Sequence, residues 1–281
     1  MAFKRAFPWI VTAVVMAATF AVAGGLTIRR DRAEAARSAA ASPDVTVSQA
    51  EDDRAYARLL RENLDQGRPE EASVLAQFPD LARREGDALF VRGPRGPRGD
   101  VASFSDSGFC DGFDQCARWR MAGVVTVGGE RLPHLTFTHG EGELLSLLIG
   151  ADGRPRVADV GTPSGSPDGA WLVFGNESDD GGGVTVYRAD GADLVPTASK
   201  GASCRPQSWQ DATRLRMSCL VGPIGEARRV EVILARAKDG GWSLIYPDGK
   251  REPLDAIATE DGEPGDFYEG WSEKGYRRLA S

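Results

Sequence analysis

The chain has 281 residues, of which 41% are hydrophobic and 27% are charged. These proportions are typical of one globular domain with accessory segments, and they exclude a disordered or fibrous chain. The formal net charge of −7 argues against a nucleic-acid-binding protein, because such proteins neutralise phosphates with Lys and Arg. It argues in the same way against a protein that binds anionic lipid headgroups at a membrane surface.

Residues 1–28 have the pattern of an export signal. Lys4 and Arg5 precede an uncharged stretch over residues 6–28, and a basic start before an apolar run is typical of exported proteins. Small residues in an A-x-A pattern end at Ala23 and offer a cleavage site. The stretch is also long enough to cross a hydrocarbon core of ~30 Å as a helix. Two alternatives stay open: a cleaved signal peptide, or a signal anchor that holds the protein at the inner membrane.

Residues 29–48 are rich in Ala and Arg and predict a linker, and residues 49–86 predict a helical segment. In its first part, apolar side chains recur at helical spacing at Tyr56, Leu59, Leu60 and Leu64. A second short helix is expected to begin at Pro69, with an apolar side formed by Val74, Leu75, Phe78 and Leu81. We expect this segment to cap a β domain. The alternative is an arm that binds a partner or dimerises the chain.

The remaining residues, 87–281, have the pattern of a mainly β domain. Short apolar or alternating runs occur at 88–91, 102–104, 121–127, 135–137, 144–149, 171–174, 184–187, 215–220, 230–235 and 242–246. Turn-forming pairs separate them, at Gly128-Gly129, Asp152-Gly153, Asp168-Gly169, Asp190-Gly191, Asp239-Gly240 and Asp248-Gly249. Because such pairs favour hairpins, we expect about ten short antiparallel strands in a sandwich, a barrel or a propeller.

An internal repeat of 43 residues favours the propeller. When Asp168 is aligned with Asp211 and Leu172 with Leu215, each copy contains a turn, two strands and then an Asp-Gly pair. A period of about 40–45 residues with several strands is typical of propeller blades.

One copy of the repeat also carries a recognisable signature. The residues Ser166, Pro167, Asp168 and Gly169, followed by Trp171 and an apolar run, resemble the repeat signature of TolB-like, WD-type β-propeller proteins. The sequence is also similar to uncharacterised exported bacterial proteins in which a Cys- and Asp-rich segment precedes one such blade. The resemblance implies a propeller-like domain or a partial propeller, because about 160 residues suffice for only three or four blades. It implies binding or scaffolding, and it transfers no catalytic residue.

Four cysteines follow the export signal, at Cys110, Cys116, Cys204 and Cys219. Their spacing favours two local disulfides, Cys110–Cys116 and Cys204–Cys219, which suit an oxidising compartment. Neither pair has the C-x₂-C spacing of a zinc site or a redox dithiol. We therefore expect a periplasmic or other extracytoplasmic protein.

Two histidines suggest a metal site, which we do not favour. His134 and His139 lie near Glu141 and Glu143, all of them residue types that bind metals. The odd separation of the histidines, however, places them on opposite faces of a strand. We expect solvated strand-end residues and no metal.

Acidic residues gather in two predicted loops, with Asp106, Asp111 and Asp114 in one and Glu177, Asp179 and Asp180 in the other. The first group lacks the regular order of a calcium loop, so we expect a solvated turn held by the first disulfide. The second group could serve an envelope hydrolase if it converged with another acid across a cleft.

Tryptophans fall on or just before the predicted strands, as do Trp119, Trp171 and Trp242, and we expect them to pack in the core. A C-terminal aromatic segment ends at Tyr276, and we expect it to hold the last residues against the domain; a docking peptide is the alternative.

The sequence as a whole predicts an exported cell-envelope protein that is a non-catalytic binding or scaffold module without a cofactor. Its expected partner is a protein or an envelope polymer, and the membrane if the signal stays uncleaved. An envelope hydrolase using Asp/Glu pairs, or a small lectin-like or inhibitor module, is the alternative.

Overall fold

The computed structural model describes residues 51, 54, 55, 58, 62, 65, 67–93, 99–106, 117–139, 143–178, 181–223, 225–257 and 275–279. The chain divides into two compact units, residues 1–56 and 57–281, and every strand lies in the second. The six described residues before Gly67 are helical, in agreement with the helix expected in this region. The export signal and the linker lie outside the described residues. Within the described part, no helix is long and apolar enough to cross a membrane.

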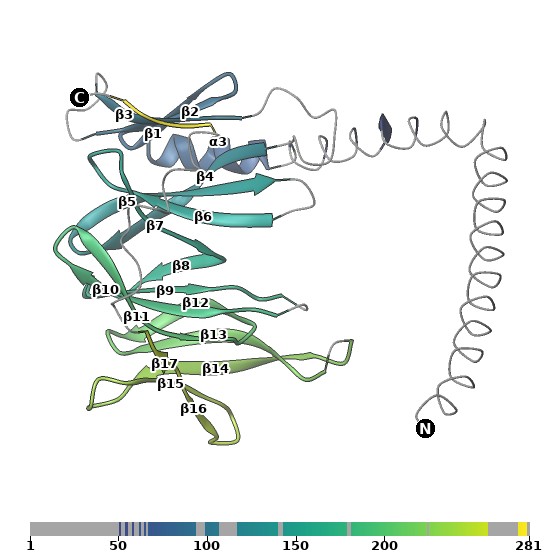
Figure 1. Ribbon diagram of the computed structural model, residues 1–281, viewed down its shortest axis with the longest axis vertical. Coiled ribbons are helices and arrows are strands. Elements are labelled where there is room, and N and C mark those ends of the chain that lie inside the picture. Colours follow the sequence, from purple (N-terminus) through teal and green to yellow (C-terminus); the bar gives the residue numbers. More distant parts are fainter. Residues whose placement is uncertain are drawn as a thin grey trace, which may run out of the picture. The chain divides into compact units, whose positions relative to one another are not determined.

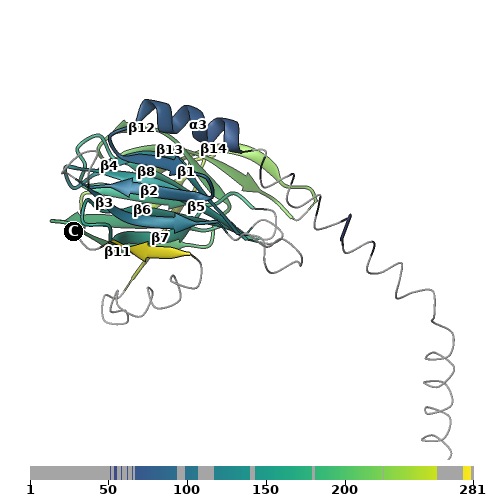
Figure 2. The same cartoon turned by 90° about the horizontal axis from the view of Figure 1, so that it is seen from above.

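Helix α3 (Arg68–Gln77) begins where the sequence predicts, with Pro69 in its first turn. Its side chains Val74 and Leu75 pack against the hydrophobic core. The helix contacts two strands, β1 (Ala82–Glu85) and β4 (Ala117–Val127). Figure 2 shows α3 along one side of the sheets, with the C-terminal strand on the other side. Helix α3 is therefore a cap on the β domain, as expected.

The expectation that the helical segment continues to residue 86 is wrong. The Phe78 amide donates a hydrogen bond to the Val74 carbonyl at 3.1 Å, and Pro79 then stops the helix because it has no amide to donate. The chain turns and forms β1, and Gly86 links β1 to β2 with a φ of +57°, a conformation that glycine adopts without strain. The sheets therefore begin at Ala82, within the segment that had been expected to be helical.

The strands form four antiparallel sheets, which we name A to D in chain order. Sheet A contains β1, β2 (Ala88–Arg92), β3 (Asp100–Ser105) and β18 (Tyr276–Arg278). Sheet B contains β4, β5 (Glu130–His139), β6 (Glu143–Ile149) and β7 (Pro155–Val160). Sheet C contains β8 (Thr162–Gly165), β9 (Trp171–Gly175), β10 (Val184–Asp190), β11 (Asp193–Lys200) and β17 (Asp255–Ala256). Sheet D contains β12 (Cys204–Asp211), β13 (Arg214–Val221), β14 (Arg228–Arg236), β15 (Trp242–Ile245) and β16 (Arg251–Pro253).

Three hydrophobic cores lie between successive sheets, so the sheets form a stack (Figure 1). The core between A and B contains Leu89, Phe104, Trp119, Leu135 and Leu147. The core between B and C contains Val125, Leu132, Leu148, Leu172 and Phe174. The core between C and D contains Trp171, Val186, Leu215, Val232, Leu234 and Trp242. Sheets B and C thus bury residues on both faces. The three tryptophans expected in the core are buried, Trp119 on sheet B, Trp171 on sheet C and Trp242 on sheet D.

The repeat found in the sequence corresponds to a repeat in the structure. In each sheet the first hairpin turns at an equivalent place, at Gly86-Asp87, Gly128-Gly129, Asp168-Gly169 and Ala212-Thr213. The aligned residues Leu172 and Leu215 lie at equivalent positions on β9 and β13, and both are fully buried. All ten predicted strands are present, and the mainly β fold is confirmed. Among the described residues, none of the four sheets closes on itself.

The C-terminal strand β18 completes the N-terminal sheet by pairing with β3. The Tyr276 ring packs against Phe104 with centroids 5.2 Å apart, and its hydroxyl donates a hydrogen bond to the Gly153 carbonyl at 2.9 Å. The expectation that the C-terminal segment holds the last residues against the domain is confirmed at Tyr276. The aromatic residues that precede it, Phe267, Tyr268 and Trp271, lie outside the described part.

Candidate functional site: the outer face of sheet D

Sheet D ends the stack of described strands, and among the described residues it buries only one face against a neighbouring sheet. On β13 the side chains of Leu215 and Met217 point into the core between C and D, because alternate residues of a strand face opposite sides. The residues between them point away from the stack. We name this second surface the outer face of sheet D; it consists of Arg205, Gln207, Ser208, Arg214, Arg216, Ser218, Leu220, Arg229, Glu231, Ile233, Ala235, Ser243 and Ile245.

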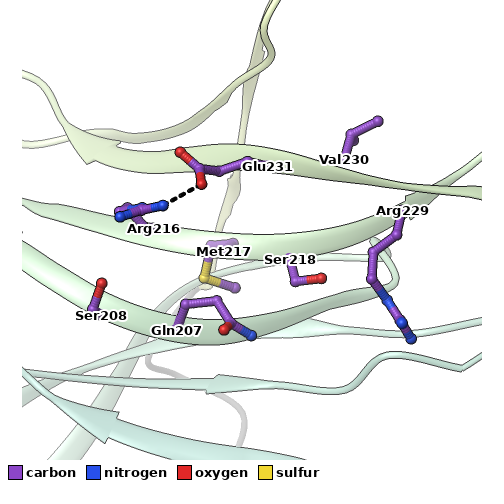
Figure 3. Close-up of a pocket in the computed structure, with 8 residues that line it drawn as sticks. All are labelled: Gln207, Ser208, Arg216, Met217, Ser218, Arg229, Val230 and Glu231. Carbon is purple, nitrogen blue, oxygen red and sulfur yellow. Dashed lines mark hydrogen bonds and ion pairs between the residues drawn. The ribbon is translucent and has the colours of Figure 1, made fainter.

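A shallow depression of about 540 Å³ lies on this outer face (Figure 3). Its lining comes from three neighbouring strands and comprises Gln207, Ser208, Arg216, Met217, Ser218, Arg229, Val230 and Glu231. A shift in strand register between Pro206 and Ser208 bends β12 at this place. Because of this bulge, the consecutive residues Gln207 and Ser208 are both exposed beside the depression.

Two ion pairs arrange the charged groups of the depression. Arg216 pairs with Glu231 across β13 and β14, and both side chains stay largely exposed, at 45% and 58%. Arg229 donates a hydrogen bond through Nε to Glu177 at 2.8 Å. Glu177 belongs to the segment that follows β9 in sheet C, and it also accepts a hydrogen bond from the Ser218 hydroxyl at 3.3 Å. The exposed pair of Arg216 and Glu231 contributes only about 0–1 kcal/mol to stability, so Arg216 is held only weakly by Glu231.

The strands β12, β13 and β14 of sheet D are basic, although the chain is acidic. Six exposed arginines lie on β12, β13 and β14, at Arg205, Arg214, Arg216, Arg228, Arg229 and Arg236, against two acidic residues, Asp211 and Glu231. The whole chain has a formal net charge of −7. Arg236 stacks on Trp171 at 4.4 Å from the ring centroid and so belongs to the boundary with sheet C. The other five arginines give this end of the stack a positive charge.

The disulfide predicted between Cys204 and Cys219 is present and joins β12 to β13. The two residues are directly opposite in the strand pairing, with Cα atoms 4.0 Å apart, and both are buried. The bond therefore ties together the two strands that carry Arg205, Arg214 and Arg216. Cys110 and Cys116, the other predicted pair, lie outside the described residues.

The repeat motif of residues 166–171 forms a turn. The Ser166 hydroxyl donates a hydrogen bond to Asp168 at 2.6 Å and accepts one from the Trp171 amide at 2.9 Å. The bond from Ser166 lowers the pKa of Asp168 below its usual value. Pro167 is exposed, and Gly169 has a φ of +72°. These contacts stabilise the turn that joins β8 to β9, so the sequence motif corresponds to this hairpin.

Of the two histidines, only His134 has a described side chain, and it contacts a serine. His134 lies on β5, where its Nε2 is 2.9 Å from the Ser146 hydroxyl, and burial lowers its pKa to about 4. The expectation that His134 is a solvated residue is therefore wrong. The side chain of His139 and the residues Glu141 and Asp179 fall outside what the structure describes. In the described residues, no group of three or more His, Cys, Asp or Glu side chains could hold a metal ion.

The contact between His134 and Ser146 superficially resembles a catalytic base with its nucleophile. The Ser146 hydroxyl, however, donates its single proton to the Gly161 carbonyl, so the His134 Nε2 must be the donor to Ser146. A general base would have to accept that proton. Ser146 is also completely buried, so this pair offers no nucleophile to a substrate.

A buried charge network, which the sequence did not reveal, fixes helix α3 to the sheets. Glu71 accepts two hydrogen bonds from Arg84, each at 2.7 Å, and Asp106 accepts one from Arg68 at 2.6 Å. Burial raises the pKa of Asp106, although Arg84, Arg68 and Arg118 lower it. The prediction that Asp106 lies in a solvated turn is therefore wrong. No signal in the sequence could have identified this network, because the residues joined by its hydrogen bonds, Glu71 with Arg84 and Arg68 with Asp106, are 13 and 38 residues apart.

The two acidic loops do not form a described carboxylate pair. Glu177 faces Arg229 and Ser218, and the residues Asp111, Asp114, Asp179 and Asp180 lie outside the described part. The outer face of sheet D combines an open depression with several exposed arginines.

Comparison with known proteins identifies no relative of the chain. No protein-family model, no curated protein sequence and no solved structure matches the chain.

Proposed function

We propose that the protein is an exported, non-catalytic binding module of the cell envelope, which contacts its partner through the outer face of sheet D. The export pattern of residues 1–28 and the Cys204–Cys219 disulfide support an oxidising, extracytoplasmic location. In this proposal the four stacked sheets are blade-like repeats of a partial propeller, and the stack is a rigid support for its last sheet.

One observation carries the proposal: an ordered, uncovered set of arginines on the end sheet of an acidic chain. Arg216 and Arg229 remain 45% and 66% exposed although each has an ion-pair partner. The pair of Arg216 with Glu231, exposed on both sides, does not stabilise the fold appreciably. Arginine is, moreover, enriched at protein interfaces because its planar head makes several directed hydrogen bonds.

Photo-cross-linking in the native host tests the proposal. A photoreactive amino acid placed at Gln207, beside the depression, is expected to give a discrete adduct after irradiation. The matched control places the same amino acid at Thr126, an exposed polar residue on β4 of sheet B, and is expected to give none. The absence of an adduct from residue 207, or the same adducts from both positions, would overturn the proposal.

A further inference from the structure

We infer that the outer face of sheet D binds an extended, carboxylate-rich polypeptide segment. This inference rests on the proposed function and specifies the partner of the same surface. It follows from the charge of the face, from the spacing of its arginines and from the apolar residues between them.

The charge of the face selects an anionic partner. Arg205 has no ion-pair partner among the described residues, and Arg214 interacts with the neighbouring Asp211, whose carboxylate is exposed. Guanidinium groups bind carboxylates through two parallel hydrogen bonds. The pair between Arg216 and Glu231 shows that a carboxylate can already reach an arginine of this face. An incoming carboxylate can take the place of Glu231, because that pair is exposed to solvent.

The spacing of the arginines matches an extended chain. Arg214 and Arg216 are successive outward residues of β13, so their Cα atoms are about 6.6 Å apart. Alternate side chains of an extended peptide have the same separation, and carboxylates at every second position would therefore meet both arginines. Ser208 on β12 pairs with Arg216 on β13, and its hydroxyl group lies beside this arginine as a further hydrogen-bonding group.

The surroundings of the arginines favour a polypeptide over a polyphosphate. Ile233 on β14 pairs with Arg216 on β13 and with Ile245 on β15. The side chains of both isoleucines are partly exposed. Such a strip of apolar side chains beside the arginines can receive the apolar side chains of a peptide. Glu231 and Glu177, in contrast, repel a chain that carries a negative charge on every unit.

Titration of the full chain with short fluorescent peptides tests the inference. A peptide of alternating Glu and Thr is expected to bind, to weaken as salt is raised, and to lose binding when Gln replaces Glu. The double variant Arg214→Glu/Arg216→Glu is expected to bind about tenfold or more weakly. The matched control is Arg188→Glu on sheet C, whose side chain is 54% exposed, and it is expected to bind as the unmodified chain does.

The variants must keep their fold for this comparison. Circular dichroism and the charge-neutral pair Arg214→Gln/Arg216→Gln provide that check, and the neutral pair is expected to lose an intermediate part of the affinity. No binding of the Glu-Thr peptide would overturn the inference. Equal or tighter binding of inorganic polyphosphate would also overturn it, because the face would then recognise anions in general. A cross-link from residue 207 without peptide binding would contradict only this inference, whereas loss of the cross-link would contradict the proposed function itself.

Discussion

The carboxylate of Glu71 on helix α3 accepts a hydrogen bond from the amide of Met121 on β4, at 2.9 Å. Asp106 accepts a hydrogen bond from the amide of Trp119 on the same strand, at 2.7 Å. Strand β4 lies at the edge of sheet B, so these amides have no partner strand. Two buried carboxylates, held by Arg84, therefore take the place of a neighbouring strand and protect the edge from pairing with other chains.

Replacing Glu71 by Ala is expected to lower the free energy of unfolding by about 3 kcal/mol. The change leaves Arg84 buried without its main counter-charge and removes the acceptor of the Met121 amide. Urea denaturation measures the effect. The control is Glu70→Ala, one residue earlier and exposed, which should change stability by less than about 0.5 kcal/mol. Equal, small losses for both variants would contradict a stabilising role for the network.

His134 is expected to make the fold less stable as the pH falls from about 6.5 to about 4. Its pKa in the native protein is about 4, so in this range the unfolded chain binds a proton that the native chain does not. The loss amounts to about 3 kcal/mol at most, and below pH 4 the histidine contributes no further change. His134→Gln keeps an amide that can donate to Ser146 but does not titrate. The difference in unfolding free energy between the unmodified protein and the His134→Gln variant should therefore change between about pH 6.5 and about pH 4. A difference that stays constant over this range would contradict the low pKa of His134.

Removing the disulfide is expected to cost about 3 kcal/mol of stability, because it closes a loop of 15 residues in the unfolded chain. The variant Cys204→Ala/Cys219→Ala should melt at a lower temperature than the oxidised protein. Addition of a reductant should lower the melting temperature of the unmodified protein further than that of the variant. If the variant melts at the same temperature as the oxidised protein, β12 and β13 do not depend on this bond.

Gly161 is expected to tolerate no side chain. It is the one residue between β7 in sheet B and β8 in sheet C, with a φ of +105°. A Cβ atom there would lie 2.3 Å from the carbonyl oxygen of Gly175. Gly161→Ala should therefore destabilise the protein by at least about 2 kcal/mol in denaturant titrations. Gly201→Ala, where a Cβ would meet nothing within 4 Å, serves as the control and should be nearly neutral.

The sequence predicts the sheets well where apolar residues alternate between clear turns. It identifies β9 and β13 and shows that they are equivalent strands of the repeat. Each follows a turn in which an aspartate accepts a hydrogen bond from the amide two residues later, Asp168 before Leu172 and Asp211 before Leu215. Among the strands that it misses, β7, β8, β11 and β12 each contain a proline, at Pro155, Pro163, Pro196 and Pro206. Proline argues against a strand in a sequence, but it is accepted at sheet edges and bulges. Strands β7, β8 and β12 lie at or next to such edges, and β11 has a register shift beside Pro196.

The candidate site could be predicted only in part. The disulfide under it follows from cysteine spacing, whereas the basic face does not, since Arg205, Arg216 and Arg229 are far apart in the sequence. They come together through the pairing of β12, β13 and β14. The motif that is most conspicuous in the sequence, around Asp168, proves to be a turn. Local sequence patterns thus predict turns and strands. They do not predict a surface that forms only when three strands pair side by side.

Covalent footprinting of arginines tests the binding role of the outer face of sheet D most directly. The full chain is treated with an arginine-specific dicarbonyl reagent, with and without a saturating peptide of alternating Glu and Thr, and the modified residues are identified by mass spectrometry. The account predicts slower modification of Arg205, Arg214 and Arg216 in the presence of the peptide. It predicts unchanged modification of two exposed arginines elsewhere, Arg154 in the turn before β7 and Arg188 on sheet C. Protection of all arginines alike, or of none on sheet D, would contradict the claim that this face is the binding site.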